Sequence, residues 1–313
     1  MKDNSYIPII QEIERENVDD YKEKLLTLSS CCWDNIIRSP DIDKWLSNFT
    51  GKVLDSIIAE QILALHLAIN FVYFTENDVR SMSQNLWWKY CHYLIDNYED
   101  DGWDNKTNLE KIDFIVRNSS INPLGNLAGS GTNICYYFRQ ANSLDGALFR
   151  TYDPEEHKLF CVIDDATLSG KSAIDDLRRY SEIINSSKAF YLTFITSDKA
   201  IAALNETHPN LKVISALELD DSSKMFNDSS MFFYGKEEWK PIAKYLCRSY
   251  GEKLFSHHSL GYNKGQYALG FFYNTPNNTL PVFWGERFGW NPLFKRYFTS
   301  KGNNVVADDE FFY

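Results

Sequence analysis

One segment constrains the fold of this chain more than any other. An apolar run over residues 159–163 ends in two adjacent acids, Asp164 and Asp165, and small residues then lead directly into a helix-like pattern. A short continuous apolar run that ends in charge is typical of a strand buried on both faces of a parallel sheet. The residues between the acids and the helix are Ala166, Thr167, Leu168, Ser169, Gly170, Lys171 and Ser172.

The residues around this segment continue an alternation of strands and helices. The pattern predicts a helix over 132–139, a strand over 160–163, a helix over 172–184, a strand over 189–195, a helix over 198–204 and a strand over 213–217. Strands that alternate with helices at this spacing predict an α/β fold with a parallel sheet and helices on both of its faces.

The flanking regions follow a different pattern. Residues 1–118 are expected to be helical, with an amphipathic helix over 10–28, an apolar stripe over 53–72 and a helix over 77–95. A further helix is expected over 235–255, followed by loops. We therefore expect three parts, which are a helical extension over 1–111, an α/β core over 112–234 and a C-terminal helix and loop region over 235–313 that packs on the core.

Composition and charge argue against a nucleic-acid-binding protein and against a membrane-spanning one. The net charge is −11, from 32 basic and 43 acidic residues, and an acidic surface repels nucleic-acid backbones at long range. The longest apolar stretch, residues 62–74, is well short of the ~20 residues that a membrane span needs. Because the first residues contain no signal-type apolar core, a cytoplasmic protein that does not use a membrane is expected. The six cysteines form no C-x-x-C pair, so reduced thiols are expected.

The acidic segment has the parts of a phosphate-binding site. Ligands of open parallel sheets bind at the carboxyl ends of the strands, and the N–H groups of a following helix form an anion cradle. Gly170 allows the backbone to approach a phosphate closely, and the hydroxyls of Thr167, Ser169 and Ser172 can donate hydrogen bonds. Adjacent carboxylates suit sugar hydroxyls and a magnesium-bound ligand, because hard cations prefer oxygen.

A nucleotide-binding P-loop is the first alternative for this segment. Gly170-Lys171-Ser172 matches the end of the G-x-x-x-x-G-K-[ST] motif, but that motif needs glycine where this chain has Asp165. An acid at that position would place negative charge inside the phosphate cradle. The P-loop interpretation is therefore excluded.

The segment resembles the phosphoribosyl-pyrophosphate motif of type I phosphoribosyltransferases: an apolar strand, two acids, three variable residues and then Ser/Thr-Gly-x-Ser/Thr. The resemblance implies a Rossmann-like sheet in which Asp164 and Asp165 hold the ribose 2- and 3-hydroxyls as catalytic residues and contact Mg²⁺ indirectly, through the ligand. It implies that residues 166–172 wrap the 5-phosphate. Lys171 departs from the small residue often found there. The alternative is an acidic turn before a capped helix, with no ligand.

A second segment lies upstream in the order that the same family shows. Small residues precede the helix expected over 132–139, and such a turn can bind phosphate. The resemblance implies that these residues hold the pyrophosphate, with Arg139 and Arg150 as candidate partners. The alternatives are an ordinary turn and two surface or structural arginines. The residues of the expected pyrophosphate loop are Ala128, Gly129, Ser130 and Gly131.

The long additions resemble one branch of this superfamily. Roughly residues 50 to 295 are similar to phosphoribosyltransferase-like effectors of bacterial conflict systems, including some retron anti-phage systems. In the C-terminal loop, Asn274, Asn277 and Asn278 carry amides that could bind a base edge, with a tryptophan stacked on the base. The alternative is a packed loop whose amides bind its own backbone. The resemblance implies a partner protein or a complex of reverse transcriptase and nucleic acid, and a homo-oligomer is a further candidate.

Three functions stay open on the sequence. The first is an active transferase or glycosidase that serves as a toxic effector, and the second is a subunit that binds a ribose phosphate or another nucleotide-like ligand without turnover. The third is a nucleotide salvage enzyme, which the long helical extension argues against. The intact acids favour the first over the second, whereas the lack of an identifiable general base for an acceptor keeps the second open.

Overall fold

The computed structural model describes residues 4–125 and 130–296. Contacts divide the described residues into two compact units: unit 1 contains residues 4–76 and 220–296, and unit 2 contains residues 77–125 and 130–219. These boundaries differ from the three sequential parts expected above. The N-terminal helices share a unit with the C-terminal segment, and the helices over 76–118 belong with the sheet instead of with the extension.

Unit 2 is built on a four-stranded sheet in which every pairing is parallel, in the order β2-β3-β4-β5. The α/β class and the parallel sheet expected from the sequence are confirmed. In β4 every residue after Lys188 is buried, which explains the unbroken apolar pattern of the central strands. The strands are β2 (Ser119–Pro123), β3 (Leu159–Thr167), β4 (Lys188–Ser197) and β5 (Leu211–Leu219).

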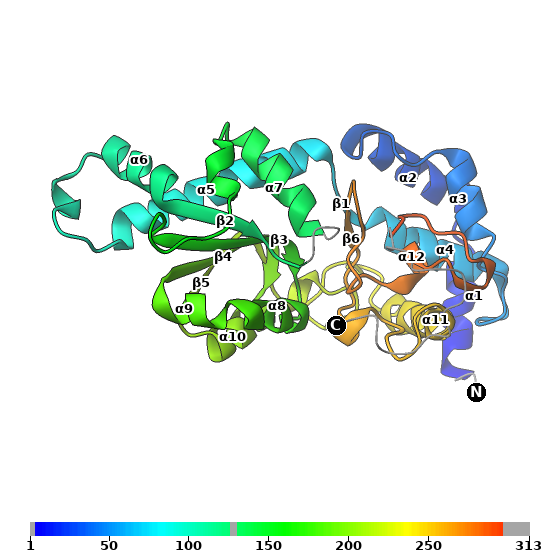
Figure 1. Ribbon diagram of the computed structural model, residues 1–313. Helices are drawn as coiled ribbons and strands as arrows, with labels where there is room; N and C mark the ends of the chain where they lie inside the picture. The colour runs from blue at the N-terminus through cyan, green and yellow to red at the C-terminus, as the bar shows by residue number, and fades with distance from the viewer. Residues whose placement is uncertain (1–3, 126–129, 297–313) are drawn as a thin grey trace. The chain divides into compact units, whose positions relative to one another are not determined.

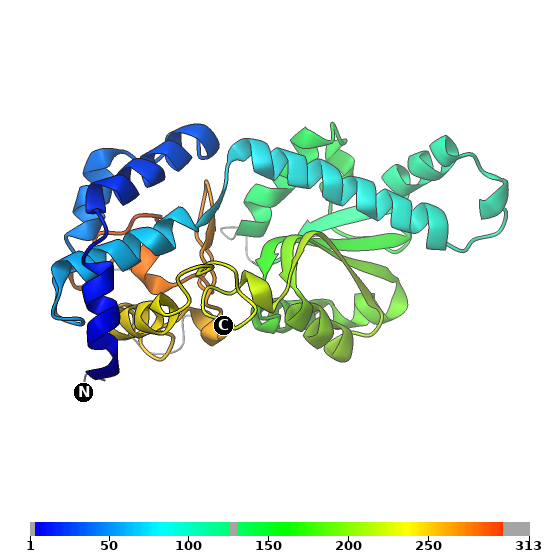
Figure 2. The ribbon, with the colours of Figure 1, turned by 180° about the vertical axis from the view of Figure 1, so that it is seen from behind.

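Helices cover both faces of this sheet, as expected (Figures 1 and 2). On one face lie α5 (Glu76–Asn97) and α7 (Ser130–Ala141), and the ring of Tyr90 on α5 packs edge-on against Phe190 of β4 at 5.1 Å. An apolar cluster fills the other face, where Leu177 and Leu204 pack with Tyr191. The helices there are α8 (Lys171–Leu177), α9 (Ser181–Ser186) and α10 (Asp198–Thr207), while α6 (Asn108–Asn118) precedes β2 in the chain. The single helix expected over 172–184 is wrong, because a 3-10 turn separates α8 from α9.

Unit 1 begins with short helices. The single helix expected over 10–28 is also wrong, because the chain turns at Asn17, whose side chain accepts a hydrogen bond from the N–H of Asp19 at 2.9 Å and caps a new helix. The expectation of helix throughout 1–118 fails as well, since β1 (Val72–Phe74) pairs in parallel with β6 (Leu269–Phe271). The helices are α1 (Ile7–Ile13), α2 (Val18–Cys32), α3 (Ser39–Leu46) and α4 (Ile57–Ile69).

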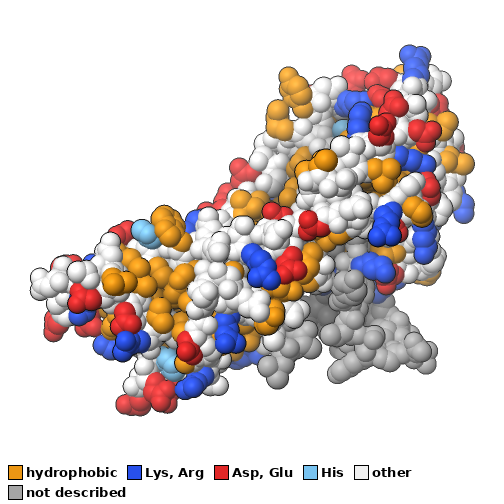
Figure 3. Space-filling view, turned by 90° about the horizontal axis from the view of Figure 1, so that it is seen from above, with side chains coloured by type: hydrophobic (Ala, Val, Ile, Leu, Met, Phe, Trp, Pro, Cys, Tyr) orange, Lys and Arg blue, Asp and Glu red, His pale blue; other side chains and the backbone are white. Residues whose placement is uncertain are grey.

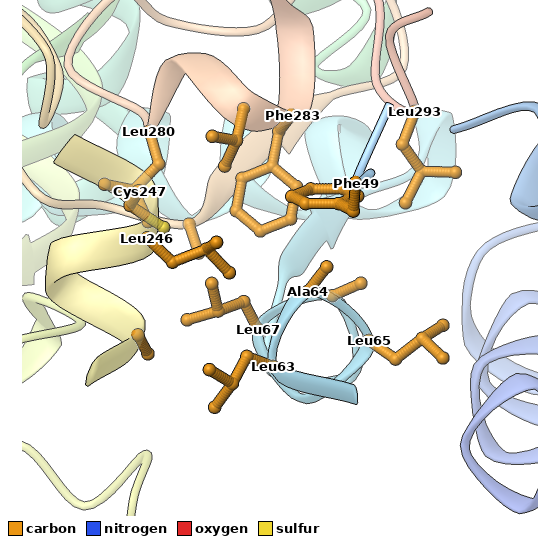
Figure 4. Close-up of a cluster of buried hydrophobic side chains, with 14 of the residues drawn as sticks. Phe49, Leu63, Ala64, Leu65, Leu67, Leu246, Cys247, Leu280, Phe283 and Leu293 are labelled. Atoms are coloured by element: carbon orange, nitrogen blue, oxygen red, sulfur yellow. The ribbon is translucent and has the colours of Figure 1, made fainter. Parts of the chain in front are cut away.

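The core of unit 1 surrounds α4, which is apolar on nearly every side. Figure 4 shows Leu63 and Leu67 of α4 near Leu246 and Cys247 of α11 (Trp239–Leu254), with Phe283 of α12 (Pro281–Trp284) on the same side of the helix as Phe49. A helix that is apolar all round is stable only when it is enclosed. The N-terminal and C-terminal segments therefore need each other to bury α4.

The described surface gives two further findings. None of the described helices has both the length and the apolar character needed to cross a bilayer. On the face shown in Figure 3, the described Lys and Arg side chains are interspersed with Asp and Glu side chains. That face shows no continuous basic stripe of the kind that follows a nucleic-acid backbone.

A buried carboxylate organises the loop before α4. Glu60 is fully buried, and its Oε1 accepts hydrogen bonds from the N–H groups of Val53 (2.7 Å) and Leu54 (2.9 Å). Its Oε2 accepts from the N–H of Gly51 (2.8 Å) and from the hydroxyl of Tyr250 on α11 (2.7 Å). Burial raises the pKa of Tyr250 to about 12, so this hydroxyl stays protonated and donates. Glu60 therefore joins the loop, α4 and α11.

We expect Glu60→Gln to lower the free energy of unfolding by about 2–4 kcal/mol, because an amide nitrogen would face donors in a buried site. Urea unfolding followed by tryptophan fluorescence measures the change. Glu23→Gln on the exposed face of α2 is the matched control and should change stability by less than about 0.5 kcal/mol. Equal stability of the two variants would contradict the structural role of Glu60.

Candidate functional site

The two acids lie at a step in the edge of the sheet. The last pair between β2 and β3 joins Pro123 to Ile163, whereas β3 continues beside β4 as far as Thr167. Asp164 and Asp165 therefore have β4 on one side, while β2 has already ended on the other. This is the carboxyl end of the strands, where ligands of open α/β sheets bind.

Backbone and side-chain donors fix the acids. Asp164 is partly exposed; its Oδ1 accepts from the N–H of Asp165 at 2.9 Å and its Oδ2 accepts from the hydroxyl of Tyr191 at 2.9 Å. Asp165 is buried and its Oδ1 accepts from the N–H of Ala166 at 2.8 Å. Desolvation, and then repulsion by Asp165, raise the pKa of Asp164 well above its ordinary value. The pair is thus poised to accept hydroxyl donors or a positive charge.

The loop after the acids is shorter than the segment expected from the sequence. Ala166 and Thr167 still belong to β3, and Lys171 and Ser172 already belong to α8, so Leu168, Ser169 and Gly170 make the turn. The side chains that hold this backbone were not predicted, although polar residues at the end of an apolar strand are a visible signal for them. They belong to β4: Thr193 donates to Asp165 O (3.3 Å), Thr196 to Thr167 O (3.2 Å) and Ser197 to Leu168 O (2.8 Å).

Gly170 is required at the start of α8 for two reasons. Its φ of +78° lies in the left-handed region, which favours glycine. A Cβ atom there would lie 3.3 Å from the Cα of Ala200 and 3.4 Å from the Cβ of Ala203, both on α10. The turn is therefore packed closely against α10, and the first N–H groups of α8 are held at the carboxyl edge of the sheet.

A second helix begins at the same edge. Of the expected pyrophosphate loop, Ala128 and Gly129 lie outside the described residues, while Ser130 and Gly131 are the first residues of α7. A Cβ atom on Gly131 would lie 2.5 Å from Leu124 O and 3.3 Å from Ile163 O, so only glycine fits. Because Ile163 directly precedes Asp164, the N-terminus of α7 lies beside the acids, while α8 follows them along the chain after the end of β3 and the turn at Gly170. Each N-terminus contributes N–H donors and the positive end of a helix dipole.

The structure places the two candidate arginines away from the acids. Arg139 lies eight residues after Gly131 on α7, about 12 Å along the helix, and its Nε donates to Leu144 O at 3.3 Å. Arg150 lies beside the start of β2, where its carbonyl oxygen accepts from the hydroxyl of Ser120 at 2.8 Å. Neither side chain is brought to the carboxyl edge together with Asp164.

The three asparagines belong to unit 1, where their groups hold the C-terminal loop. The Asn278 side chain is buried and its Nδ2 donates to Tyr262 O at 3.1 Å, while Asn277 O accepts from Tyr262 N at 2.8 Å. Asn274 O accepts from Phe271 N at 2.8 Å in a turn. The indole N–H of Trp284 donates to Thr279 O at 2.8 Å. These contacts match the packed-loop alternative.

A magnesium ion fits this site only together with a ligand. Among the described residues, no three His, Cys, Asp or Glu side chains converge on a position that could hold a metal ion. The acid pair supplies hard oxygen donors, and phosphate oxygens of a ligand would have to supply others. The sequence resemblance implies an indirect contact, in which Asp164 and Asp165 bind the ligand that carries the ion.

Comparisons with known proteins place the chain in a family. One similar solved structure is the orotate phosphoribosyltransferase from Aeropyrum pernix, which is 16% identical; the match covers 34% of this chain and 63% of that one, with a TM-score of 0.23. No curated protein matches the chain. A sequence model of the PRTase-CE family matches residues 42–296, which include both the acids and the starts of α7 and α8. The chain therefore belongs to the PRTase-CE family and is a phosphoribosyltransferase-like protein, which confirms the superfamily resemblance seen in its sequence.

Proposed function

We propose that this protein binds 5-phosphoribosyl-pyrophosphate, accompanied by Mg²⁺, at the carboxyl edge of β3 and transfers its phosphoribosyl group. The observation that carries the proposal is that Asp164 and Asp165 lie on β3 beside the start of α7 and shortly before the turn that leads into α8. A ligand with a sugar between two phosphate groups matches this arrangement of carboxylates flanked by two anion cradles.

Each part of the ligand has a place in this proposal. The turn at Gly170 and the start of α8 hold the 5-phosphate through backbone N–H groups. The start of α7 at Gly131 holds the pyrophosphate. The ribose lies between them, with its 2- and 3-hydroxyls donating to Asp164 and Asp165. Because contacts with β4 and α10 fix the turn at Gly170, this cradle is formed before the ligand arrives.

The reaction is a displacement at the anomeric carbon of the ribose. The bond from this carbon to the pyrophosphate oxygen breaks, the pyrophosphate leaves with the electron pair, and a bond to the acceptor forms. Positive charge develops on the sugar ring as the leaving group departs, and the carboxylates of Asp164 and Asp165 stabilise that charge. Bound Mg²⁺ would neutralise the leaving pyrophosphate. The chain itself contributes mainly by positioning the two phosphate groups.

We further propose that this activity makes the protein a toxic effector in bacterial anti-phage defence, with retron systems as one setting. The support is the similarity of the acidic motif, the turn before α7 and the C-terminal loop to effectors of that kind. A cytoplasmic location and a partner protein or a reverse-transcriptase complex belong to the same proposal. The acceptor would be a nucleotide or a nucleic acid.

Calorimetric titration with phosphoribosyl-pyrophosphate and Mg²⁺ tests the site. We expect saturable binding by the wild type and a loss of at least about 100-fold in Asp164→Asn/Asp165→Asn, because two charge-assisted contacts to the ribose disappear. Asp100→Asn/Asp101→Asn is the matched control, since it removes two adjacent, exposed acids from the same unit and should bind as the wild type does.

Two results would contradict parts of this proposal. If the wild type does not bind, the site serves another ligand. If the wild type binds but neither releases pyrophosphate nor arrests growth when it is expressed in bacteria, the protein is a binding subunit and not a toxic enzyme.

Gly170→Ala tests the phosphate turn. We expect at least about a tenfold loss of affinity for phosphoribosyl-pyrophosphate, because the new methyl group would press against Ala200 in a left-handed backbone and displace the turn. Gly102→Ala is the control, since Gly102 has a φ of +75° in the same unit but no heavy atom within 4 Å of the added Cβ. Both changes should lower the unfolding free energy by about 1 kcal/mol through the left-handed backbone, and Gly170→Ala by roughly 1 kcal/mol more through the contact with Ala200, measured in urea. An equal affinity in the two variants would show that the turn at Gly170 does not contribute to ligand binding.

Asp164→Asn should stabilise the free protein while it weakens ligand binding. The raised pKa of Asp164 means that the folded state disfavours the carboxylate, so its destabilising effect is present at neutral pH and disappears as the pH falls below the ordinary value of 3.8. We expect the variant to gain on the order of 1 kcal/mol of unfolding free energy at pH 8 and nothing near pH 3.5. Urea titrations at the two pH values measure this, and a gain that does not depend on pH would contradict the charge argument.

A further inference from the structure

Tyr191 lies directly beneath the acid pair. It is fully buried in β4, and its ring belongs to the apolar cluster that includes Phe160, Val162 and Leu177. In the register of the sheet it pairs with Val162, two residues before Asp164. Its hydroxyl donates to Asp164 Oδ2 at 2.9 Å. Tyr191 thus connects the apolar cluster, which contains its ring, with Asp164, which accepts a hydrogen bond from its hydroxyl.

Packing alone does not explain the hydroxyl. The cluster around its ring is apolar, and phenylalanine would fill nearly the same space there without a buried polar group. A buried tyrosine hydroxyl needs a partner, and here the partner is a carboxylate, with the Thr167 hydroxyl also interacting with it. We therefore explain the Tyr191 hydroxyl by its hydrogen bond to Asp164.

The acid also needs what the hydroxyl provides. The negative charge of Asp165 disfavours the ionised form of Asp164. The N–H of Asp165 holds one oxygen of Asp164, and the Tyr191 hydroxyl holds the other, so the carboxyl plane cannot rotate. A carboxylate has about four lone-pair sites, so both oxygens keep acceptor capacity for hydroxyl groups of a ligand.

We propose that Tyr191 is a positioning residue that fixes the Asp164 carboxylate for the ribose hydroxyls of a phosphoribosyl ligand. The inference rests on the proposed function, because it assigns the ligand of Asp164. On α8, which covers the same face, Asp175 pairs with Arg178 at 3.3 Å and Asp176 with Arg179 at 3.4 Å, so these two arginines are paired with acids other than Asp164.

Tyr191→Phe and Tyr90→Phe form a matched pair for the test. Tyr90 is equally buried against the same sheet, and its hydroxyl is also hydrogen-bonded, to Ser119 Oγ at 2.8 Å, but Ser119 is the first residue of β2, at the opposite end of the strand from the acids. Both changes remove one buried hydroxyl and keep the ring. Only Tyr191→Phe leaves Asp164 with one donor fewer.

Affinity is measured by calorimetry with two probes, phosphoribosyl-pyrophosphate and inorganic pyrophosphate, each with Mg²⁺. We expect Tyr191→Phe to weaken phosphoribosyl-pyrophosphate binding by on the order of tenfold and pyrophosphate binding by less than about twofold, because only the first ligand contains the ribose. Tyr90→Phe should leave both affinities within about twofold. If Tyr191→Phe does not fold, Tyr191→Met fills the space without a hydroxyl.

The outcomes separate this inference from the proposed function. A wild type that does not bind phosphoribosyl-pyrophosphate overturns both. A wild type that binds, together with a Tyr191→Phe variant that binds equally well, overturns the positioning role and leaves the proposed function intact. An equal loss for both probes, or the same loss in Tyr90→Phe, assigns Tyr191 a structural role only.

Discussion

Two carboxylates held side by side at the end of a buried strand are the constraint on which the rest of unit 2 depends. Their mutual repulsion and partial burial disfavour ionisation of Asp164. The fold offsets this with donors from three directions: the N–H of Asp165, the N–H of Ala166 and the hydroxyl of Tyr191. An apolar strand end would be more stable, so the acids indicate a ligand and not a role in stability.

The backbone around the acids is fastened to the sheet before any ligand binds. Hydroxyls at the end of β4 hold the last residues of β3 and the turn that follows. Gly131 and Gly170 sit so close to neighbouring backbone that neither could carry a Cβ without movement. A cradle made of fixed N–H groups loses little conformational entropy when an anion binds, and this favours binding by geometry over binding by flexible side chains.

The sequence predicts what is local and fails where contacts are distant. The strand before Asp164, the helix after Gly170 and the parallel sheet follow from short patterns of apolar and small residues. The pairing of β1 with β6 could not be predicted, because nearly two hundred residues separate Phe74 from Leu269 and each strand has only three residues. A hydrophobicity pattern identifies Tyr191 only as a core residue. Its hydrogen bond to Asp164 depends on the pairing of β4 with β3, which the local sequence does not contain. The position of Arg139 could have been predicted, because eight residues of helix separate it from Gly131, about 12 Å at 1.5 Å per residue.

The charge balance at this edge gives a divalent cation a physical reason to accompany the proposed ligand. Asp164 and Asp165 are acidic, and the pyrophosphate adds further negative charge beside them. Arg139 donates to Leu144 O and Arg150 lies beside the start of β2, so at the start of α7 the described residues contribute the N–H groups of the helix. A helix N-terminus carries only about half a unit charge, too little to neutralise a pyrophosphate next to two carboxylates. A magnesium ion bound to the phosphate oxygens removes this repulsion where the chain itself does not.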